Sequence, residues 1–411
     1  MSQIIVIGAG VGGLTSAWWL LEAGHHVTLL EREPEVGSVA SYRNGGQLSY
    51  RYVAPLADAG VPLQAIGWLL RGDSPLKLCP RLDRQQWRWM AAFLGACRGS
   101  VNQRNAAHLL RLAALSQTTL AQWRDCDGLE GFDWRRNGKL VTFRHAATFE
   151  RARHKVTDRV CQQVLSAAEC IQLEPALTGG GFVGGIYTPT EEVADCHAFC
   201  QRIAAWLEAS GRCTFLLGRK VTGIRQAEGA VQAVVLGDEV MPVEHLVLAA
   251  GYRSAELGVR LPLYPLKGYS LSVPIGAQHQ APSVSITDYD RKIVYARIGE
   301  QLRVAAMVDI VGFDASLEPK RLALMKRQAL ETFPLAGDYA HAVEWAGMRP
   351  ATPTGVPLIG ASVYRNLWLN LGHGALGFTL ACGSGQLLAQ LIGRQTPSID
   401  MQGLAPGRGR A

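Results

Sequence analysis

The residues with the clearest chemical role are glycines near the start of the chain. The segment reads Gly8-Ala9-Gly10-Val11-Gly12-Gly13 and follows an apolar run at residues 4–7. Such a run is typical of a buried parallel strand, and the glycines allow a tight turn into a helix N-terminus. The free N–H groups and the positive end of the helix dipole at that turn favour a pyrophosphate. The spacing therefore predicts a dinucleotide site.

The elements around this turn have the order that a dinucleotide site requires. Residues 14–23 form the predicted helix, which ends at Gly24, and residues 27–31 form the next strand. Gly8 allows the turn, Gly10 allows close approach of the phosphates, and Gly13 lets the helix pack on the strand. At the end of the second strand, Glu31 would accept hydrogen bonds from the adenosine ribose hydroxyls.

The composition is that of a globular protein with room for two structural units. The chain has 411 residues, and no segment offers the uninterrupted run of about twenty apolar residues that a spanning helix needs. No secretory signal precedes the first strand, so we expect a cytoplasmic location. The nine cysteines are scattered without a CxxC pair, which favours reduced thiols. We interpret Cys196 and Cys200, beside His197, as small buried thiols on one helical face and expect no metal.

Charge is spread along the chain, with one stretch that combines aromatic and basic residues. The net charge of +7 forms no concentrated basic stripe, which argues against a nucleic-acid partner. Residues 61–98 interleave two sets, the apolar Trp68, Leu69, Leu70, Trp87, Trp89, Met90, Phe93 and Leu94 and the cationic Arg71, Lys77, Arg81, Arg84, Arg88 and Arg98. The pattern is typical of a helix at an anionic membrane, on the inner face of the cell membrane here, and equally of an amphipathic helix packed on the domain. The sequence leaves both interpretations open.

The rest of the chain contains two kinds of pattern. Helical periodicity covers residues 102–124, 194–210 and 377–392. Strand-like runs at 231–236, 245–249 and 367–371 fit the α/β part of the fold. Between residues 266 and 310, apolar and polar residues alternate around a turn at Gly299-Glu300, which indicates antiparallel strands. An antiparallel insertion of this kind favours a flavoprotein over a simple NAD dehydrogenase.

We therefore predict an α/β fold with two interleaved domains. A discontinuous Rossmann-like domain is interrupted by a mixed, largely antiparallel substrate domain. The predicted dinucleotide-binding domain comprises residues 1–56, 194–262 and 346–411, and the substrate domain comprises a helical first part, 57–193, and the antiparallel sheet, 263–345.

Longer motifs along the chain point to a family. They are Asn44-Gly45-Gly46-Gln47, Val61-Pro62-Leu63-Gln64-Ala65-Ile66, Tyr264-Pro265-Leu266-Lys267-Gly268-Tyr269-Ser270, Gly347-Met348-Arg349-Pro350, Asn366-Leu367-Trp368-Leu369-Asn370-Leu371-Gly372-His373-Gly374 and Ala381-Cys382-Gly383-Ser384-Gly385. With these motifs the chain resembles, nearly end to end, the FAD-dependent D-amino acid dehydrogenases of the small-subunit type, within the glycine oxidase and D-amino acid oxidase superfamily. The resemblance implies that the dinucleotide is FAD.

The same resemblance implies a reaction. A D-amino acid is oxidised to its imino acid by hydride transfer from the α-carbon to flavin N5, and water then releases a 2-oxo acid and ammonia. The electrons pass to a quinone or another respiratory acceptor. Two alternatives stay open. One is oxidation of a secondary or cyclic amino acid, such as D-hydroxyproline, proline or a sarcosine-like compound, and the other is a role as flavin subunit of a multi-subunit amine dehydrogenase.

Catalytic residues follow from the motifs by resemblance. Arg349 resembles the arginine that grips the substrate carboxylate, with a bidentate fork that turns the α-hydrogen towards flavin N5. Tyr269 and Tyr52 match tyrosines of the substrate cavity, where each hydroxyl would bond the carboxylate or close the pocket; either could instead be a core aromatic with a satisfied hydroxyl. His373, with the helix N-terminus at 374–377, would stabilise negative charge on the reduced flavin, or else cap or pack the helix.

The implied FAD contacts are spread along the chain. Residues 44–47 would wrap the isoalloxazine, and Val221 would offer backbone groups to the adenine. The full set is Gly8, Gly10, Val11, Gly12, Gly13, Glu31, Arg32, Asn44, Gly45, Gly46, Gln47, Val221, Ala250, Gly251, Gly374, Ala375, Leu376, Gly377 and Thr379.

The chain departs from the family pattern close to the predicted site. Tyr42, Arg43, Tyr50 and Arg51 stand where small residues are usual, Ala305-Ala306 replaces a Gly-Gly pair, and Thr354 replaces an aspartate. Bulkier lining would narrow the pocket, whereas extra arginines would favour an acidic side chain. The sequence does not choose between these effects.

Overall fold

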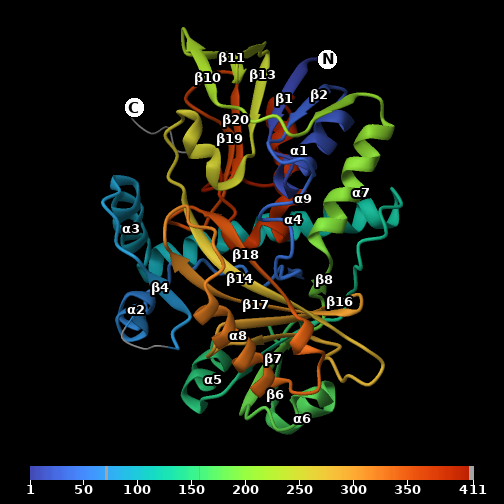
Figure 1. Cartoon of the computed structure of the whole chain (residues 1–411), viewed down its shortest axis with the longest axis vertical. Coiled ribbons are helices and arrows are strands. Elements are labelled where there is room, and N and C mark those ends of the chain that lie inside the picture. The colour runs from blue at the N-terminus through green and yellow to red at the C-terminus, as the bar shows by residue number, and fades with distance from the viewer. Residues whose placement is uncertain (70–72, 157, 407–411) are drawn as a thin grey trace.

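Two large sheets dominate the computed structural model, which describes residues 1–69, 73–156 and 158–406 (Figure 1). A six-stranded sheet occupies the upper half of the view and a nine-stranded sheet the lower half, and the long helix α4 crosses between them. The helices are α1 (Val11–Glu22), α2 (Val61–Leu69), α3 (Arg84–Ala96), α4 (Gly99–Asp125), α5 (Ala146–Arg153), α6 (Ala167–Leu173), α7 (Cys196–Ala209), α8 (Pro319–Thr332) and α9 (Gly377–Ile392).

The strands of the six-stranded sheet follow the order β19-β20-β13-β1-β2-β9. Their bounds are β1 (Gln3–Ile7), β2 (His26–Leu30), β9 (Cys213–Leu216), β13 (His245–Leu248), β19 (Leu358–Ala361) and β20 (Leu367–Leu371). All neighbours are parallel except β19 and β20. Their apolar runs are continuous because the sheet is covered on both faces. The predicted glycine turn, helix and second strand are confirmed, and Gly24 follows α1 with a φ of +84°.

The nine-stranded sheet is mostly antiparallel, with the order β18-β14-β17-β16-β15-β5-β7-β6 and β4 added beside β17. Its strands are β4 (Leu76–Leu78), β5 (Lys139–Phe143), β6 (Gln163–Ser166), β7 (Gly184–Thr188), β14 (Tyr264–Pro274), β15 (Ser285–Asp288), β16 (Ile293–Ile298), β17 (Gln301–Ile310) and β18 (Val343–Ala351). The smaller sheets contain β3 (Gln47–Leu48), β8 (Glu192–Val193), β10 (Gly223–Ala227), β11 (Ala230–Leu236) and β12 (Glu239–Pro242).

These sheets confirm the predicted α/β fold class, a Rossmann-like unit interrupted by a largely antiparallel one. The domain boundaries stay predictions. Strand β18 crosses the predicted boundary at 345/346 and pairs with β14 along its whole length. We therefore propose that the substrate domain extends to Ala351, because a strand belongs with the sheet that it completes.

Helix α9 lies in the protein core. Together with the turn before it, the stretch Gly374–Ile392 has the length and composition of a membrane-crossing helix, yet 61% of its window is buried. It packs against α1 and α4. Cys196 and Cys200 are also buried in this core, on α7, as expected for small thiols.

The aromatic and basic stretch at 61–98 divides between two environments. Trp89 is buried and donates its indole N–H to the carbonyl of Ala351 at 2.8 Å. Trp87 and Leu94 point outward, 50% and 55% exposed. For α3 the packed interpretation is therefore correct on one face, while the other face carries exposed apolar and basic residues. Leu70 and Arg71 lie outside the described residues.

Candidate active site

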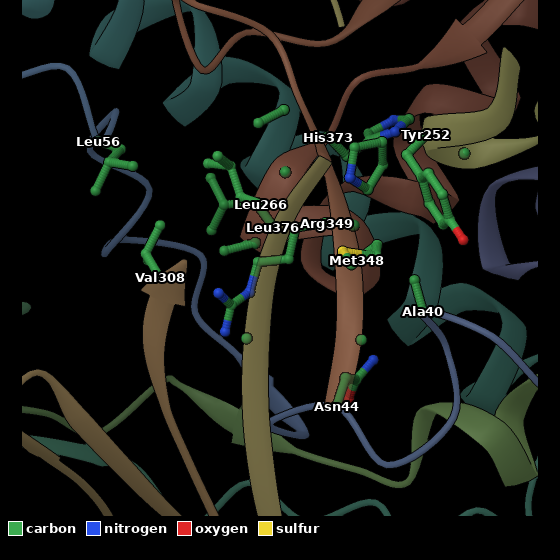
Figure 2. A pocket seen from close by; sticks show the side chains of 18 of the residues that line it. Ala40, Asn44, Leu56, Tyr252, Leu266, Val308, Met348, Arg349, His373 and Leu376 are labelled. Carbon is green, nitrogen blue, oxygen red and sulfur yellow. The ribbon is translucent and has the colours of Figure 1, made fainter. Parts of the chain in front are cut away.

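A cavity of about 1080 Å³ lies between the two large sheets and is lined by both. The glycine turn after β1 forms one end, and the pocket-facing side of β14, β17 and β18 forms the other. Figure 2 shows Arg349 in the middle of this space, with Leu56 and Val308 on one side and Asn44 and Ala40 on the other. The volume and the walls suit one extended ligand that reaches from one sheet to the other.

The glycine turn brings backbone against backbone at the first end. Gly8 has a φ of +106°, and a Cβ there would lie 2.6 Å from the carbonyl oxygen of Ala249. Gly13 faces Gly8 and not the cavity, so it serves helix packing as predicted. The N–H of Val11 donates to Ser41 Oγ at 3.0 Å, which fixes the loop over the start of α1. The helix N-terminus thus opens into the cavity.

Glu31 lines the cavity at the end of β2. Its carboxylate accepts the N–H of Ala9 at 2.7 Å and that of Glu33 at 3.0 Å. These bonds fix the carboxylate beside the glycine turn and leave further lone pairs for ribose hydroxyls. Arg32 also lines the cavity and pairs with Glu33 at 2.7 Å.

Residues 44–47 form a rigid turn over the nine-stranded sheet. Asn44 Oδ1 accepts the N–H of Gly46 at 3.0 Å, and Gly46 has a φ of +64°. Gln47 donates from its amide to Ser285 Oγ at 2.6 Å. The predicted wrapping segment is therefore held by side-chain bonds, and its residues line the cavity.

His373 lies where β20 ends and the turn to α9 begins. Its Nε2 is 3.1 Å from Ser384 Oγ, and that hydroxyl donates to the carbonyl of Ala381. Ser384 Oγ therefore accepts a hydrogen bond from the Nε2–H of the neutral ring, which leaves Nδ1 unprotonated. Burial lowers the pKa of His373 to about 4, so the ring is neutral at pH 7. His373 is thus a buried neutral ring at the cavity, and both of the roles considered above stay predictions.

Arg349 is held by an irregularity in the neighbouring strands. Strands β14 and β17 shift register between Lys267 and Tyr269, and Met307 there has a φ of +70°. This β-bulge lets the carbonyl of Met307 accept from Arg349 Nη1 at 2.8 Å. The guanidinium lies over Gly268, where any Cβ would collide with it.

Within the described part of the chain, no carboxylate pairs with the charge of Arg349. Burial lowers its pKa to about 10 and Asp309 acts in the opposite direction, so the side chain stays cationic at neutral pH. Across residues 1–69, 73–156 and 158–406, no carboxylate oxygen lies within 4.0 Å of it. A cavity cation of this kind is suited to bind a carboxylate.

The hydroxyl of Tyr269 is bound to another side chain. The side chain is buried, and its hydroxyl donates to Asp309 Oδ2 at 2.9 Å. Asp309 also accepts from Arg321 of α8 at 2.5 Å. Burial and Asp309 raise the pKa of Tyr269, so the hydroxyl stays protonated and bound to this pair. The hydroxyl of Tyr269 is thus already engaged, while the residue also lines the cavity, and its catalytic role stays a prediction.

Tyr52 lies at the cavity wall beside a buried lysine. Lys139 Nζ is 4.9 Å from the centre of the Tyr52 ring and donates to Ser49 Oγ at 2.8 Å. Burial lowers the pKa of Lys139 to about 8. Burial also raises the pKa of Tyr52, so its hydroxyl is a neutral donor. The Lys139 cation was not predicted from the sequence.

The departures from the family pattern divide into two groups. Ala305 and Ala306 line the cavity. The side chains of Tyr42, Arg43, Tyr50 and Arg51 do not, since they turn to His197, Tyr42, Glu192 and Asp158 respectively. The extra arginines therefore contribute no charge to the lining. Thr354 is likewise absent from it and bonds the backbone N–H of Val356.

Comparison with known proteins shows the family of the chain. Residues 3–391 match the family described as FAD dependent oxidoreductase. The chain belongs to this family. It is 67% identical over 407 residues to D-amino acid dehydrogenase 2 of Pseudomonas aeruginosa, covering 98% of each chain. It is also 46% identical over 425 residues to D-amino acid dehydrogenase 2 of Ralstonia nicotianae, covering 97% of this chain and 98% of that one.

Solved flavoenzymes share the fold. Glycine oxidase from Geobacillus kaustophilus superposes with a TM-score of 0.76 at 19% identity over 100% of both chains. Iminodiacetate oxidase from Chelativorans superposes with a TM-score of 0.72 at 19% identity over 98% of both chains.

The residues present fit FAD. The Cβ-free surface of Gly8, the helix N-terminus after Gly10 and the carboxylate of Glu31 match the pyrophosphate and ribose ends of the cofactor. The residues predicted to contact FAD line the cavity, with the exception of Gly13: Gly8, Gly10, Val11, Gly12, Glu31, Arg32, Asn44, Gly45, Gly46, Gln47, Val221, Ala250, Gly251, Gly374, Ala375, Leu376, Gly377 and Thr379. Arg349, Tyr269, His373 and Tyr52 line it as well.

Several lining residues escaped the sequence analysis, among them Asp58, Lys139 and Lys292. Lys139 begins a strand, and Lys292 lies in a turn, positions that are usually exposed. No local pattern marks them as cavity residues. Among the described residues, no group of three or more His, Cys, Asp or Glu side chains is placed to hold a metal ion.

Proposed function

We propose that this FAD-dependent oxidoreductase oxidises D-amino acids to 2-oxo acids and ammonia and passes the electrons to a quinone. The observation that carries the proposal is Arg349, a cavity cation without a close carboxylate partner among the described residues. The high identity to two proteins named D-amino acid dehydrogenase supports the substrate class and the stereochemistry.

The side chains of the cavity bind and orient the substrate. One guanidinium edge of Arg349 is engaged by Met307, and its remaining N–H groups are available to the substrate α-carboxylate. FAD, when bound, accepts the hydride that leaves the α-carbon. Leu56, Leu266 and Val308 supply apolar surface around the reacting carbon and exclude water from it. No strong base is required, because the amine is neutral when the hydride leaves.

Anaerobic bleaching of the bound flavin tests this proposal. The holoenzyme is mixed with D-, L- and N-alkyl amino acids without oxygen, and the flavin absorbance is followed. We expect D-amino acids to bleach the flavin and their L-isomers to leave it oxidised. Bleaching by L-isomers alone would overturn the stereochemistry, and bleaching by N-alkyl compounds alone would favour a secondary amine as substrate. Turnover with quinone and without peroxide identifies the acceptor.

We further propose that the enzyme is cytoplasmic and that the outward face of α3 contacts the inner face of the cell membrane. Trp87 and Leu94 are exposed on that face, and the exposed cations Arg84 and Arg88 lie beside them. Apolar and basic residues in this arrangement favour anionic lipid. The protein should sediment with anionic liposomes at low salt and dissociate as salt rises. A Trp87→Ser/Leu94→Ser variant that sediments as well as the parent would remove α3 from the interface.

A further inference from the structure

Two lysines line the cavity in addition to Arg349 on the side of the nine-stranded sheet. They are Lys139 at the start of β5 and Lys292 in the turn between β15 and β16. Neither has a carboxylate oxygen within 4.0 Å among the described residues. A cavity that binds one carboxylate through Arg349 therefore contains further positive charge, and the position of each lysine determines what that charge can bind.

Lys292 lies in the same cross-strand row as the Arg349 guanidinium. Ile293 pairs with Ala306, so Lys292 is next to Met307, and Gly268 lies opposite Met307 on the other side. The guanidinium covers Gly268. Since neighbouring strands are about 4.8 Å apart, the Lys292 backbone is about 10 Å from Gly268.

This backbone separation leaves room for a dicarboxylate between the Arg349 guanidinium and the Lys292 side chain. The four C–C bonds between the two carboxyl carbons of glutamate span about 5 Å in an extended chain. A hydrogen-bonded contact of about 3 Å at each end completes the distance. Because the Lys292 stem is long and flexible, a substrate whose α-carboxylate is bound by Arg349 can bring its side-chain carboxylate to the Lys292 ammonium.

The surroundings of Lys292 leave its ammonium available. Its Nζ is 3.6 Å from the centre of the Tyr289 ring, and burial lowers its pKa. Of the nearby carboxylates, Asp288 is paired with Arg144 at 2.7 Å and Asp290 accepts the backbone N–H of Arg144 at 2.6 Å. Asp58 lines the same cavity from the loop before α2 and is more than 4.0 Å from the ammonium.

Lys139 is less suited to this task. Its ammonium already donates to Ser49, and the buried carboxylate of Glu191 acts on it. Lys139 pairs with Ser285, and the same cross-strand row continues through Ala296 to Arg303 on β17. Arg303 is four residues from Met307 along that strand. That offset places it about 13 Å along the strands from the row of Lys292.

We propose that Lys292 binds the distal carboxylate of an acidic D-amino acid and makes D-glutamate-like substrates the preferred class. The inference rests on the proposed function, because it requires Arg349 to hold the α-carboxylate. In this proposal the charge that favours an acidic side chain comes from Lys292, which lines the cavity, and not from Arg43 or Arg51.

The test compares D-glutamate with its uncharged isostere D-glutamine. We measure kcat/KM for both, and for D-aspartate, with the holoenzyme and an artificial electron acceptor. The parent protein should prefer D-glutamate over D-glutamine by at least about tenfold, since a desolvated charge pair is added. Lys292→Met keeps an unbranched side chain and should lower kcat/KM for D-glutamate by about 30-fold, so that the two substrates become nearly equal.

Three further variants assign the effect to Lys292. Lys320→Met, on the exposed surface of α8, should keep the parent ratio. Lys292→Arg keeps the charge and should retain the preference. Collapse of the ratio in Lys139→Met, and not in Lys292→Met, would overturn the assignment. If Lys292 served only to hold the Asp58 loop through a salt bridge, Lys292→Met and Asp58→Asn would slow the oxidation of both substrates alike. That result would also overturn the proposal.

The same data separate this inference from the proposed function. If neutral D-amino acids are oxidised and D-glutamate has no advantage over D-glutamine, the inference fails and the function stands. If no D-amino acid bleaches the flavin, the function itself fails. Where Lys292→Met loses its flavin, the comparison is made with Lys292→Arg and the parent alone, and equal D-glutamate and D-glutamine rates in both contradict the proposal.

Discussion

Replacing Arg349 with alanine should weaken the binding of every D-amino acid by about two orders of magnitude. Truncating one partner of a buried, hydrogen-bonded charge pair costs about 2–5 kcal/mol. Here one guanidinium nitrogen stays committed to Met307, and Asp309 acts on the charge from behind the sheet. Only part of the guanidinium therefore serves the substrate, and we expect about 3 kcal/mol, or about 150-fold in kcat/KM.

The assay is anaerobic reduction of the flavin at increasing D-alanine concentration. It separates the dissociation constant of the substrate from the limiting rate of reduction. For Arg349→Ala the dissociation constant should rise by most of the predicted factor. Arg349→Lys keeps a positive charge and loses the planar fork, so it should lie between the parent and the alanine variant.

A matched control is Arg327→Ala on α8, whose side chain is 66% exposed and lies outside the cavity lining. It should behave as the parent protein. Flavin absorbance and melting temperature verify that each variant is folded and loaded. An Arg349→Ala enzyme with a dissociation constant within threefold of the parent would refute the argument that this guanidinium binds the carboxylate.

Three other predictions follow from the geometry. Gly268→Ala places a Cβ in the guanidinium of Arg349, so kcat/KM should fall by at least about tenfold while FAD stays bound. The control Gly223→Ala, with no atom within 4 Å of its Cβ, should leave kcat/KM unchanged. Equal kinetics for the two variants would contradict the steric argument. Gly8→Ala combines a φ of +106° with a backbone collision and should yield protein that purifies without FAD, as measured by its absorbance ratio. Burial lowers the pKa of His373 from 6.5 to about 4, so its contribution to stability is complete above pH 6.5 and is lost as the pH falls towards 4. Between pH 7.5 and 4.5 the free energy of unfolding in urea should fall by about 2.5 kcal/mol through this residue, a loss that His373→Asn removes; an equal fall in the variant would exclude His373 as its source.

Local patterns in the sequence predicted the parallel half of the fold. The apolar run before Gly8, the helix after it and Glu31 at the next strand end are all defined within about thirty residues, a span over which strand, turn and helix signals act together. The hairpin at Gly299-Glu300 was predicted for the same reason, since its turn residues lie between its own two strands.

The charges that face the cavity could not be predicted from such local patterns. Lys139 is buried beside Ser49 and Tyr52, a contact between segments far apart in the chain, and Lys292 is half-buried. The same applies to Tyr269, whose partner Asp309 is forty residues away. A sequence read in short windows gives the type of each residue and not the charge that faces it.

The bulge at Met307 explains why Arg349 is available to a substrate. Side chains alternate along a strand, so without an extra residue Asp309 would face the cavity together with Ala305. Instead Ala306 and Met307 both pack against the core under α8, the alternation inverts, and Val308 takes the cavity side. Asp309 then lies under α8, where Tyr269 and Arg321 bind it. The irregularity removes from the cavity the carboxylate that would neutralise Arg349, and the same shift turns a carbonyl towards the guanidinium to hold it in place.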